Sequence, residues 1–247
     1  MLFRESLEIP KYRSDPQNNS LSHYFIFNSP SFSQFLAEHP HERGEVEFLK
    51  SIAEEGMIAV EIGGYAGMTT VAIAKSVGDK GIVYCFEPIP EYRKLLQQNL
   101  LLNNIENVKI FPYAVTDKKG EEVFYINGGA TSFIPQENTE KITVKTISLD
   151  TFLEEHRMEK IDLLHMDCEG SELLVLKGAE KTLRKNKVKI FCEIHHDFLS
   201  KISQSVWDIV NYLKTLGYKV KAVKLDDLTL HENFQTCEYL YATSPPL

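Results

Sequence analysis

The sequence predicts an α/β fold: a doubly wound, seven-stranded, mostly parallel sheet with helices on both faces, plus an N-terminal helical extension and an inserted β-hairpin. From residue 57 onward, short runs without a polar face alternate with helical patterns, which is typical of a parallel sheet covered on both sides. A glycine-rich turn, Gly63-Gly64-x-x-Gly67, follows the first run. The apolar fraction of 43% is ordinary for a globular chain of 247 residues.

The first 56 residues differ from the rest. We expect residues 1–56 to form an extension of loop and helices, and residues 57–247 to form the main domain. Two helical stretches in the extension are separated at Pro40, and Ser31 or Ser33 can cap the first of them. Val46, Leu49, Ile52 and Ala53 share one face of the second stretch, which we expect to pack on the edge of the main domain.

The main domain contains seven predicted strands. They are residues 57–62, 81–88, 107–115, 161–167, 188–196, 218–223 and 237–243. The predicted helices between them are residues 68–78, 90–104, 171–186 and 205–217. The pattern is interrupted by a predicted hairpin of residues 121–126 and 141–147, followed by a short helix at 148–156 that Ser148 can cap.

Charge and composition exclude several classes of partner. The formal net charge is −8, so the chain does not attract nucleic acid through a long-range field, and we expect no nucleic-acid partner. We also expect no membrane span and a cytoplasmic location, because no apolar run reaches the length of a span and the N-terminus lacks an apolar signal segment. The four cysteines have no C-x-x-C spacing, which argues against a zinc site made of cysteines alone.

The glycine turn predicts a ligand site. Ligands of open α/β sheets bind outside the carboxyl ends of the strands, and glycine lets a ligand lie against bare backbone. Glu87 ends the next strand, 20 residues after Gly67, where a carboxylate can accept both hydroxyls of a ribose. Together these residues indicate an adenosine-like ligand. The alternative is a tight turn with close packing of helix on strand.

Glu61 favours one ligand over another. The dinucleotide pattern G-x-G-x-x-G is absent, and an acid two residues before Gly63 repels a pyrophosphate but attracts an ammonium or a sulfonium. S-adenosylmethionine carries both of those cations and no phosphate. The alternative for Glu61 is a helix cap or a bond within its own turn.

Several segments resemble the FkbM family of class I, Rossmann-like methyltransferases. These are "VEIGGYAGMTT", "CFEPIPEYRKLLQQNLLLNN", "PYAVTDKKGEEVFY" and, most specifically, "IDLLHMDCEGSELLVLKGAEKTL", followed by "FCEIH". His165 stands where the family more often has lysine, and Glu61 where it more often has aspartate. The resemblance implies methyl transfer from S-adenosylmethionine to a hydroxyl, most readily of a sugar, a glycan or a small metabolite.

The glycine turn, the acids and this resemblance together predict the site residues. The cofactor-binding set is Glu61, Gly63, Gly64, Tyr65, Gly67, Thr69, Glu87, Pro88, Ala114, Val115 and Asp167. The substrate-binding set is Ser132, Glu169 and His196, with Gly129 and Thr131 as further donors in the loop that holds Ser132.

Titratable residues gather at the ends of the fourth and fifth strands. The candidate catalytic residues are Asp167, which positions the reacting groups, and His195 ahead of His165, which accept the hydroxyl proton. One alternative is that these groups cap helices and bond backbone. Another is a divalent metal such as magnesium, held by Asp167, Glu169 and a histidine, although the spacing assigns no metal ligands.

Two other functions stay open. A non-catalytic module that binds S-adenosylmethionine has no need for the acid–histidine cluster, and a nucleotide-dependent oxidoreductase lacks its dinucleotide pattern. The acceptor and the oligomeric state do not follow from the sequence.

Overall fold

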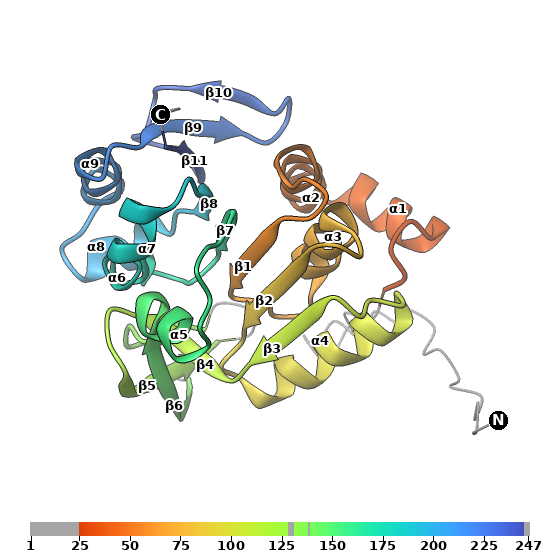
Figure 1. Ribbon diagram of the computed structural model, residues 1–247, viewed down its shortest axis with the longest axis horizontal. Coiled ribbons are helices and arrows are strands. Elements are labelled where there is room, and N and C mark those ends of the chain that lie inside the picture. The colour runs from red at the N-terminus through yellow and green to blue at the C-terminus, as the bar shows by residue number, and fades with distance from the viewer. Residues whose placement is uncertain (1–24, 128–130, 138, 245–247) are drawn as a thin grey trace.

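The computed structural model describes residues 25–127, 131–137 and 139–244 (Figure 1). Its centre is a sheet with the strand order β10-β9-β11-β8-β7-β1-β2-β3. The strands are β1 (Ile58–Ile62), β2 (Ile82–Phe86), β3 (Val108–Phe111), β7 (Leu163–Met166), β8 (Lys189–Glu193), β9 (Lys219–Lys224), β10 (Thr229–His231) and β11 (Tyr239–Thr243). The doubly wound α/β prediction is confirmed.

The sheet differs from the prediction in strand number and in one detail of direction. It has eight strands rather than seven, because the three-residue strand β10 pairs with β9 in a hairpin. Strand β11 runs antiparallel to both of its neighbours, β8 and β9, so the sheet is mixed. The pairs β3–β2, β2–β1, β1–β7 and β7–β8 are parallel, so their carboxyl ends meet along one edge.

A second, smaller sheet has the order β4-β6-β5. Strands β5 (Gly120–Ile126) and β6 (Glu140–Ser148) form the predicted hairpin, and β4 (Tyr113–Thr116) pairs parallel to β6. The predicted strand 107–115 is thus two strands in two sheets. Pro112 lies between them, where a residue without an amide hydrogen interrupts a ladder of hydrogen bonds.

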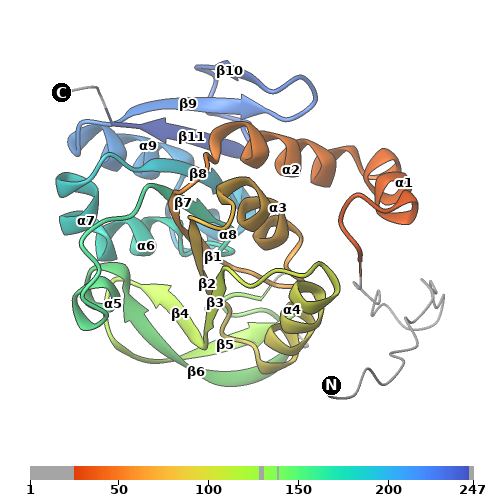
Figure 2. The same ribbon diagram turned by 45° about the vertical axis from the view of Figure 1, so that its right-hand side comes forward.

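Helices cover both faces of the main sheet (Figures 1 and 2). On one face lie α1 (Pro30–Glu38), α2 (Pro40–Ile52), α3 (Met68–Val77) and α4 (Pro90–Leu102). On the other lie α5 (Leu149–Glu155), α6 (Glu172–Gly178), α7 (Glu180–Lys185) and α9 (Val206–Thr215), while α8 (His196–Lys201) follows β8. No helix of the described residues is long and apolar enough to cross a membrane.

Local signals in the helices are mostly where the sequence placed them. The break at Pro40 is confirmed, and the Ser148 hydroxyl accepts a hydrogen bond from the Thr151 amide at 3.2 Å, as a cap of α5. The cap of α1 is Ser29 rather than Ser31 or Ser33, since its hydroxyl accepts from the Phe32 amide at 3.2 Å. The single helix predicted at 171–186 is two short helices separated at Ala179.

Strand alternation decides which helices meet the polar residues of the sheet. Val60 and Ile62 face α5, α6 and α9, so Ala59 and Glu61 face α2 and α3. The register places Glu61 directly opposite His165 on β7. Glu61 and His165, two ionisable side chains of the central strands, therefore point toward α2. This helix belongs to the predicted N-terminal extension. Residues 1–24 of that extension lie outside the described residues.

Candidate active site

The glycine turn after β1 is packed against the protein's own chain. Gly63 has φ of 92°, and a Cβ on it would overlap the carbonyl oxygen of Asp167 at the end of β7. A Cβ on Gly64 would overlap the Cys85 sulfur, and one on Gly67, whose φ is 87°, would overlap the Leu96 side chain. Close packing of the turn accounts for all three glycines, whatever ligand lies beside them.

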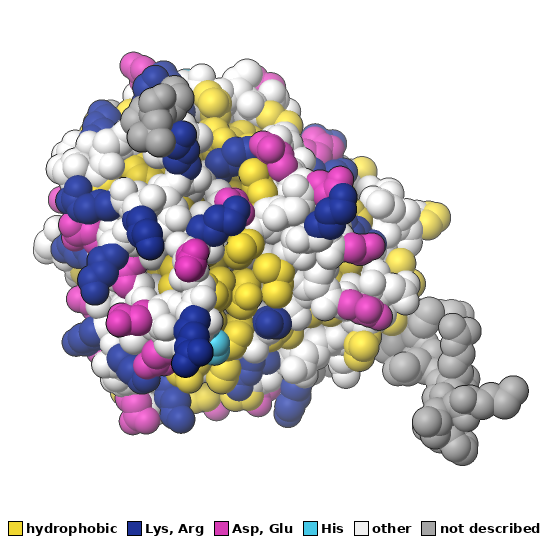
Figure 3. All heavy atoms as spheres, viewed as in Figure 1, with side chains coloured by type: hydrophobic (Ala, Val, Ile, Leu, Met, Phe, Trp, Pro, Cys, Tyr) yellow, Lys and Arg dark blue, Asp and Glu magenta, His cyan; other side chains and the backbone are white. Residues whose placement is uncertain are grey.

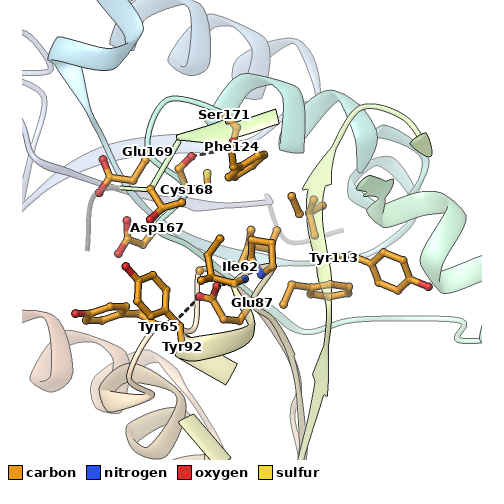
Figure 4. A pocket seen from close by; sticks show the side chains of 17 residues that line it. Ile62, Tyr65, Glu87, Tyr92, Tyr113, Phe124, Asp167, Cys168, Glu169 and Ser171 are labelled. Carbon is orange, nitrogen blue, oxygen red and sulfur yellow. Dashed lines mark hydrogen bonds between the residues drawn. The ribbon is translucent and has the colours of Figure 1, made fainter. Parts of the chain in front are cut away.

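An open cavity lies beside this turn (Figure 4). The space in it, open solvent included, is about 560 Å³. Seven of the predicted cofactor residues line the cavity: Gly63, Tyr65, Glu87, Pro88, Ala114, Val115 and Asp167. The predicted residues Glu61, Gly64, Gly67 and Thr69 are not among its lining residues.

Aromatic and apolar side chains form much of the remaining wall. Sequence reasoning missed Phe86, Ile89, Tyr92, Tyr113 and Phe124, which all line the cavity. Tyr92 follows Glu87 by five residues in the first turn of α4 and meets Tyr65 edge to face, with ring centroids 4.7 Å apart. Phe124 comes from β5 of the hairpin, so the smaller sheet supplies one side of the cavity. Flat apolar walls of this kind suit a nucleobase.

Glu87 is a buried carboxylate that the turn holds in place. Its Oε2 accepts from the Tyr65 amide at 2.9 Å and its Oε1 accepts from the Ile89 amide at 2.8 Å. Burial raises the pKa of Glu87 to about 7, although these two hydrogen bonds oppose the shift. Each oxygen keeps lone-pair capacity for a further donor, so the carboxylate can still receive hydroxyl groups from the cavity.

Glu61 and His165 belong to a buried ion chain under the turn. The His165 ring lies between Glu45 of α2, 3.3 Å from Nε2, and Glu61, 3.4 Å from Nδ1. Burial alone lowers the pKa of His165, but its interactions with the two adjacent glutamates outweigh burial and raise the pKa to about 10. An imidazole that is already protonated cannot accept a proton near neutral pH. His165 is also not among the cavity-lining residues, so the geometry favours a structural role.

His195 sits among four carboxylates at the ends of β7 and β8. Its Nδ1 is 2.8 Å from Glu172 Oε1. Its Nε2 is 3.4 Å from Asp167 Oδ1, 3.5 Å from Glu169 Oε2 and 3.7 Å from Glu193 Oε1. The loop after β7 turns through left-handed conformations at Glu169 and Gly170, with φ of 46° and 94°, and this brings Glu169 and Glu172 to the same ring.

Burial and mutual repulsion shape the charges of this cluster. Burial raises the pKa values of Asp167, Glu169 and Glu193, each to about 7. Burial alone lowers the pKa of His195, but the hydrogen bond with Glu172 and the charge of Asp167 raise it to about 10. Asp167 and Glu169 line the cavity, whereas His195 and Glu193 are not among its lining residues. The two carboxylates thus stand between the cavity and the imidazole.

Of the three predicted substrate-binding residues, one lines the cavity and two do not. Glu169 lines the cavity. The Ser132 hydroxyl donates to the carbonyl oxygen of Glu169 at 2.5 Å, so it ties its own loop to the cluster. His196 has its Nε2 2.8 Å from the Cys237 carbonyl oxygen, ahead of β11. Thr131 lines the cavity, and Gly129 lies outside the described residues.

Two solved structures with a similar fold are those of methyltransferases. The chain is similar to the methyltransferase FkbM of Methylobacillus flagellatus, with a TM-score of 0.52 and 17% identity over 77% of this chain and 43% of that one. It is also similar to a Streptococcus mutans methyltransferase solved with S-adenosylhomocysteine, with a TM-score of 0.50 and 12% identity over 81% of this chain and 95% of that one. At these identities the likeness shows the fold alone.

The chain belongs to the FkbM methyltransferase family. The methyltransferase FkbM domain matches residues 61–220. Two relatives are the 2-O-methyltransferase NoeI of Sinorhizobium fredii, 27% identical over 44% of this chain and 51% of the relative, and the hexuronic acid methyltransferase AglP of Haloferax volcanii, 29% identical over 62% and 63%. The match thus spans about half to two thirds of the length of each relative.

Proposed function

We propose that the chain transfers a methyl group from S-adenosylmethionine to a hydroxyl oxygen of a sugar or glycan. The observation that carries this proposal is the cavity itself, which has Glu87 and the glycine turn on one side and the Asp167–Glu169 carboxylates on the other. One named relative is a 2-O-methyltransferase, which supports transfer to oxygen, and the other is a hexuronic acid methyltransferase, which supports a sugar acceptor.

The cofactor fits the cavity in one orientation. Glu87 offers acceptors for the two ribose hydroxyls, and the apolar wall of Ala114, Val115 and Phe124 suits the adenine. The methionine end then lies toward Gly63 and Asp167, where negative charge favours the ammonium and the sulfonium. This orientation directs the methyl group toward the carboxylate cluster.

The reaction needs alignment and one proton acceptor. A lone pair of the acceptor oxygen forms the new C–O bond while the S–C bond breaks and its electron pair stays on sulfur, which leaves S-adenosylhomocysteine. The hydroxyl proton must pass to a base. Asp167 and Glu169 line the cavity, and His195 contacts both of them without lining it. We therefore propose that this carboxylate pair accepts the proton and that His195 positions the pair. The histidine base predicted from the sequence becomes, in this proposal, a group that holds the carboxylates.

The runner-up is a module that binds S-adenosylmethionine without catalysis. A pure binder has no use for the carboxylates that surround His195, because burying them together costs free energy. Nucleic acid as acceptor is disfavoured by the net charge of −8. On the face seen in Figure 3, Lys and Arg side chains of the described residues are interspersed with Asp and Glu side chains rather than gathered over one element.

A binding measurement and a turnover measurement test the proposal separately. Calorimetry should detect S-adenosylmethionine binding, and Glu87→Ala should weaken it by about 1–3 kcal/mol, while the exposed neighbour changed in Glu91→Ala should not matter. Labelled S-adenosylmethionine with a panel of neutral and acidic glycans, followed by mass spectrometry, should yield a methyl ether. Glu169→Gln should keep the cofactor affinity and lower turnover by about 10²- to 10⁴-fold. Cofactor binding without any methylated product would favour the binding module.

A further inference from the structure

We propose that Asp167, Glu193 and His195 bind a divalent metal cation at the edge of the cavity. The three side chains project from the adjacent carboxyl ends of β7 and β8, and one ligand atom from each lies within 4.8 Å of the others. The set combines two carboxylates with one imidazole, which binds an ion through Nε2 once the ion has displaced the proton from that nitrogen, and this mixture suits Mn²⁺ and Zn²⁺.

The contacts of His195 Nε2 with the nearby carboxylates are longer than hydrogen bonds, and the contact with Asp167 matches the spacing of two ligands of one ion. Oxygens of Asp167 and Glu193 lie 3.4 and 3.7 Å from that nitrogen, and Glu169 Oε2 lies at 3.5 Å. None of these contacts is a hydrogen bond of ordinary length. Two ligands of one cation, each about 2.1 Å from it and about 90–110° apart, lie roughly 3.0–3.5 Å from each other.

Buried carboxylate oxygens that accept no hydrogen bond provide a second reason. Asp167 Oδ1 is shielded from solvent and accepts no hydrogen bond in the described part of the chain. The same holds for Oε2 of Glu172, a residue with 0% exposure. Unsatisfied anionic oxygens in a buried position are costly unless a cation or a donor meets them. Within the described ranges, His195 is the only basic side chain that forms an ion pair with a carboxylate of this cluster.

Glu172 orients the imidazole as a metal site requires. Its Oε1 is 2.8 Å from His195 Nδ1 and also accepts from the Gly170 amide at 3.1 Å. The ring is therefore fixed with Nε2 directed at Asp167 and Glu193. Metal-bound histidines are commonly held in this way, with the second nitrogen on a carboxylate.

The location gives the ion a use, and this step rests on the proposed function. Asp167 both belongs to the cation set and lines the cavity. A cation there has open positions toward the cavity, where it can hold two neighbouring hydroxyls of a sugar and make the reacting one more acidic. The ion and the methyl donor would then fix the acceptor from two sides, and Glu169, which is outside the cation set, would accept the proton.

The test measures metal binding without any acceptor. Titration of the full chain with Mn²⁺, followed by the electron paramagnetic resonance signal of free Mn²⁺, should show one site per chain, and Zn²⁺ should compete for it. Glu193→Gln and His195→Ala should each weaken binding at least tenfold, and Glu172→Gln by about 10- to 100-fold. Asp197→Asn, which changes an exposed acid two residues from His195, is the matched control and should bind normally.

The outcomes separate the two proposals. Thermal unfolding of each variant shows whether it is folded, and Glu193→Gln preserves the side-chain shape if His195→Ala fails. Absence of both Mn²⁺ and Zn²⁺ binding by the unaltered chain overturns the metal site, as does equal affinity in folded Glu193→Gln. Neither result touches S-adenosylmethionine binding, whose absence instead overturns the proposed function.

Discussion

Gly63→Ala tests two contributions to stability in the turn after β1: the strain of a side chain at positive φ, and the overlap of that side chain with nearby backbone. Gly63 has φ of 92°, in the left-handed region, and a Cβ on it would overlap the carbonyl oxygen of Asp167. Gly56 provides a matched control, because its φ is 85° and a Cβ on it would have nothing within 4 Å. Both substitutions impose the same backbone strain, and only Gly63→Ala adds an overlap with backbone.

The expected magnitudes follow from these two terms. A left-handed conformation costs an alanine about 1–2 kcal/mol, which is the whole effect expected for Gly56→Ala. Relief of the overlap requires the ends of β1 and β7 to separate, at about 1–3 kcal/mol more for Gly63→Ala. The gain from restricting the unfolded chain is the same for both variants and cancels in the difference.

Urea unfolding and calorimetry with S-adenosylmethionine are the assays. Gly63→Ala should be less stable than Gly56→Ala by about 1–3 kcal/mol, or by roughly 2–12 °C in Tm for a chain of this size. It should also bind the cofactor more weakly, because Asp167 lines the cavity and must move. Equal stability of the two variants would refute the reasoning, since the overlap would then relax at no cost.

Two further predictions concern buried charges. Burial raises the pKa of Glu87 from 4.5 to about 7, so this group contributes stability that is full below about pH 4.5 and lost as the pH rises through about 7. Urea unfolding across that interval should show a smaller decline in Glu87→Gln, and an unchanged slope would contradict the shift. His165→Ala should cost about 3–5 kcal/mol of unfolding free energy, because it strands Glu45 and Glu61 without their cation. His41→Ala, which breaks an ion pair with side chains 45% and 70% exposed, should cost less than about 1 kcal/mol in the same assay.

The fold was largely predictable because parallel strands leave a strong local signal. Strands buried on both faces are apolar throughout, and the helices between them end at glycine or asparagine, as at Gly78 and Asn103. The missed features are short or depend on distant contacts. Strand β10 has three residues, two of them exposed, and lacks an apolar pattern. The break between α6 and α7 follows Gly178, where a Cβ would overlap the carbonyl oxygen of Thr116, more than sixty residues earlier in the chain.

Site residues were predictable where their spacing along the sequence indicates their role. They were not predictable where the role depends on a contact with a residue far away in the sequence. Glu87 was placed by its distance from the glycine turn, and it lines the cavity. The local sequence around Glu61 does not show whether its carboxylate contacts a ligand or a buried histidine. Alternation could have placed Glu61 on the face of Ala59, and the cross-strand register then puts it opposite His165. Nothing local identifies Glu45, which lies on the helix that covers that face.

The contacts of His165 with Glu45 and Glu61 connect α2 to the candidate active site. The family match begins at residue 61 and the predicted main domain at residue 57, so both leave α2 outside. Yet α2 supplies one of the two glutamates that hold His165, and His165 lies two residues before Asp167 on the same face of β7. The charge of Glu45 also contributes to the raised pKa values of Asp167 and Glu193. A chain without α2 would leave Glu61 and His165 open to water on one side and would lose a negative charge beside the carboxylate cluster. We therefore predict that residues 40–52 fold as one unit with the predicted main domain.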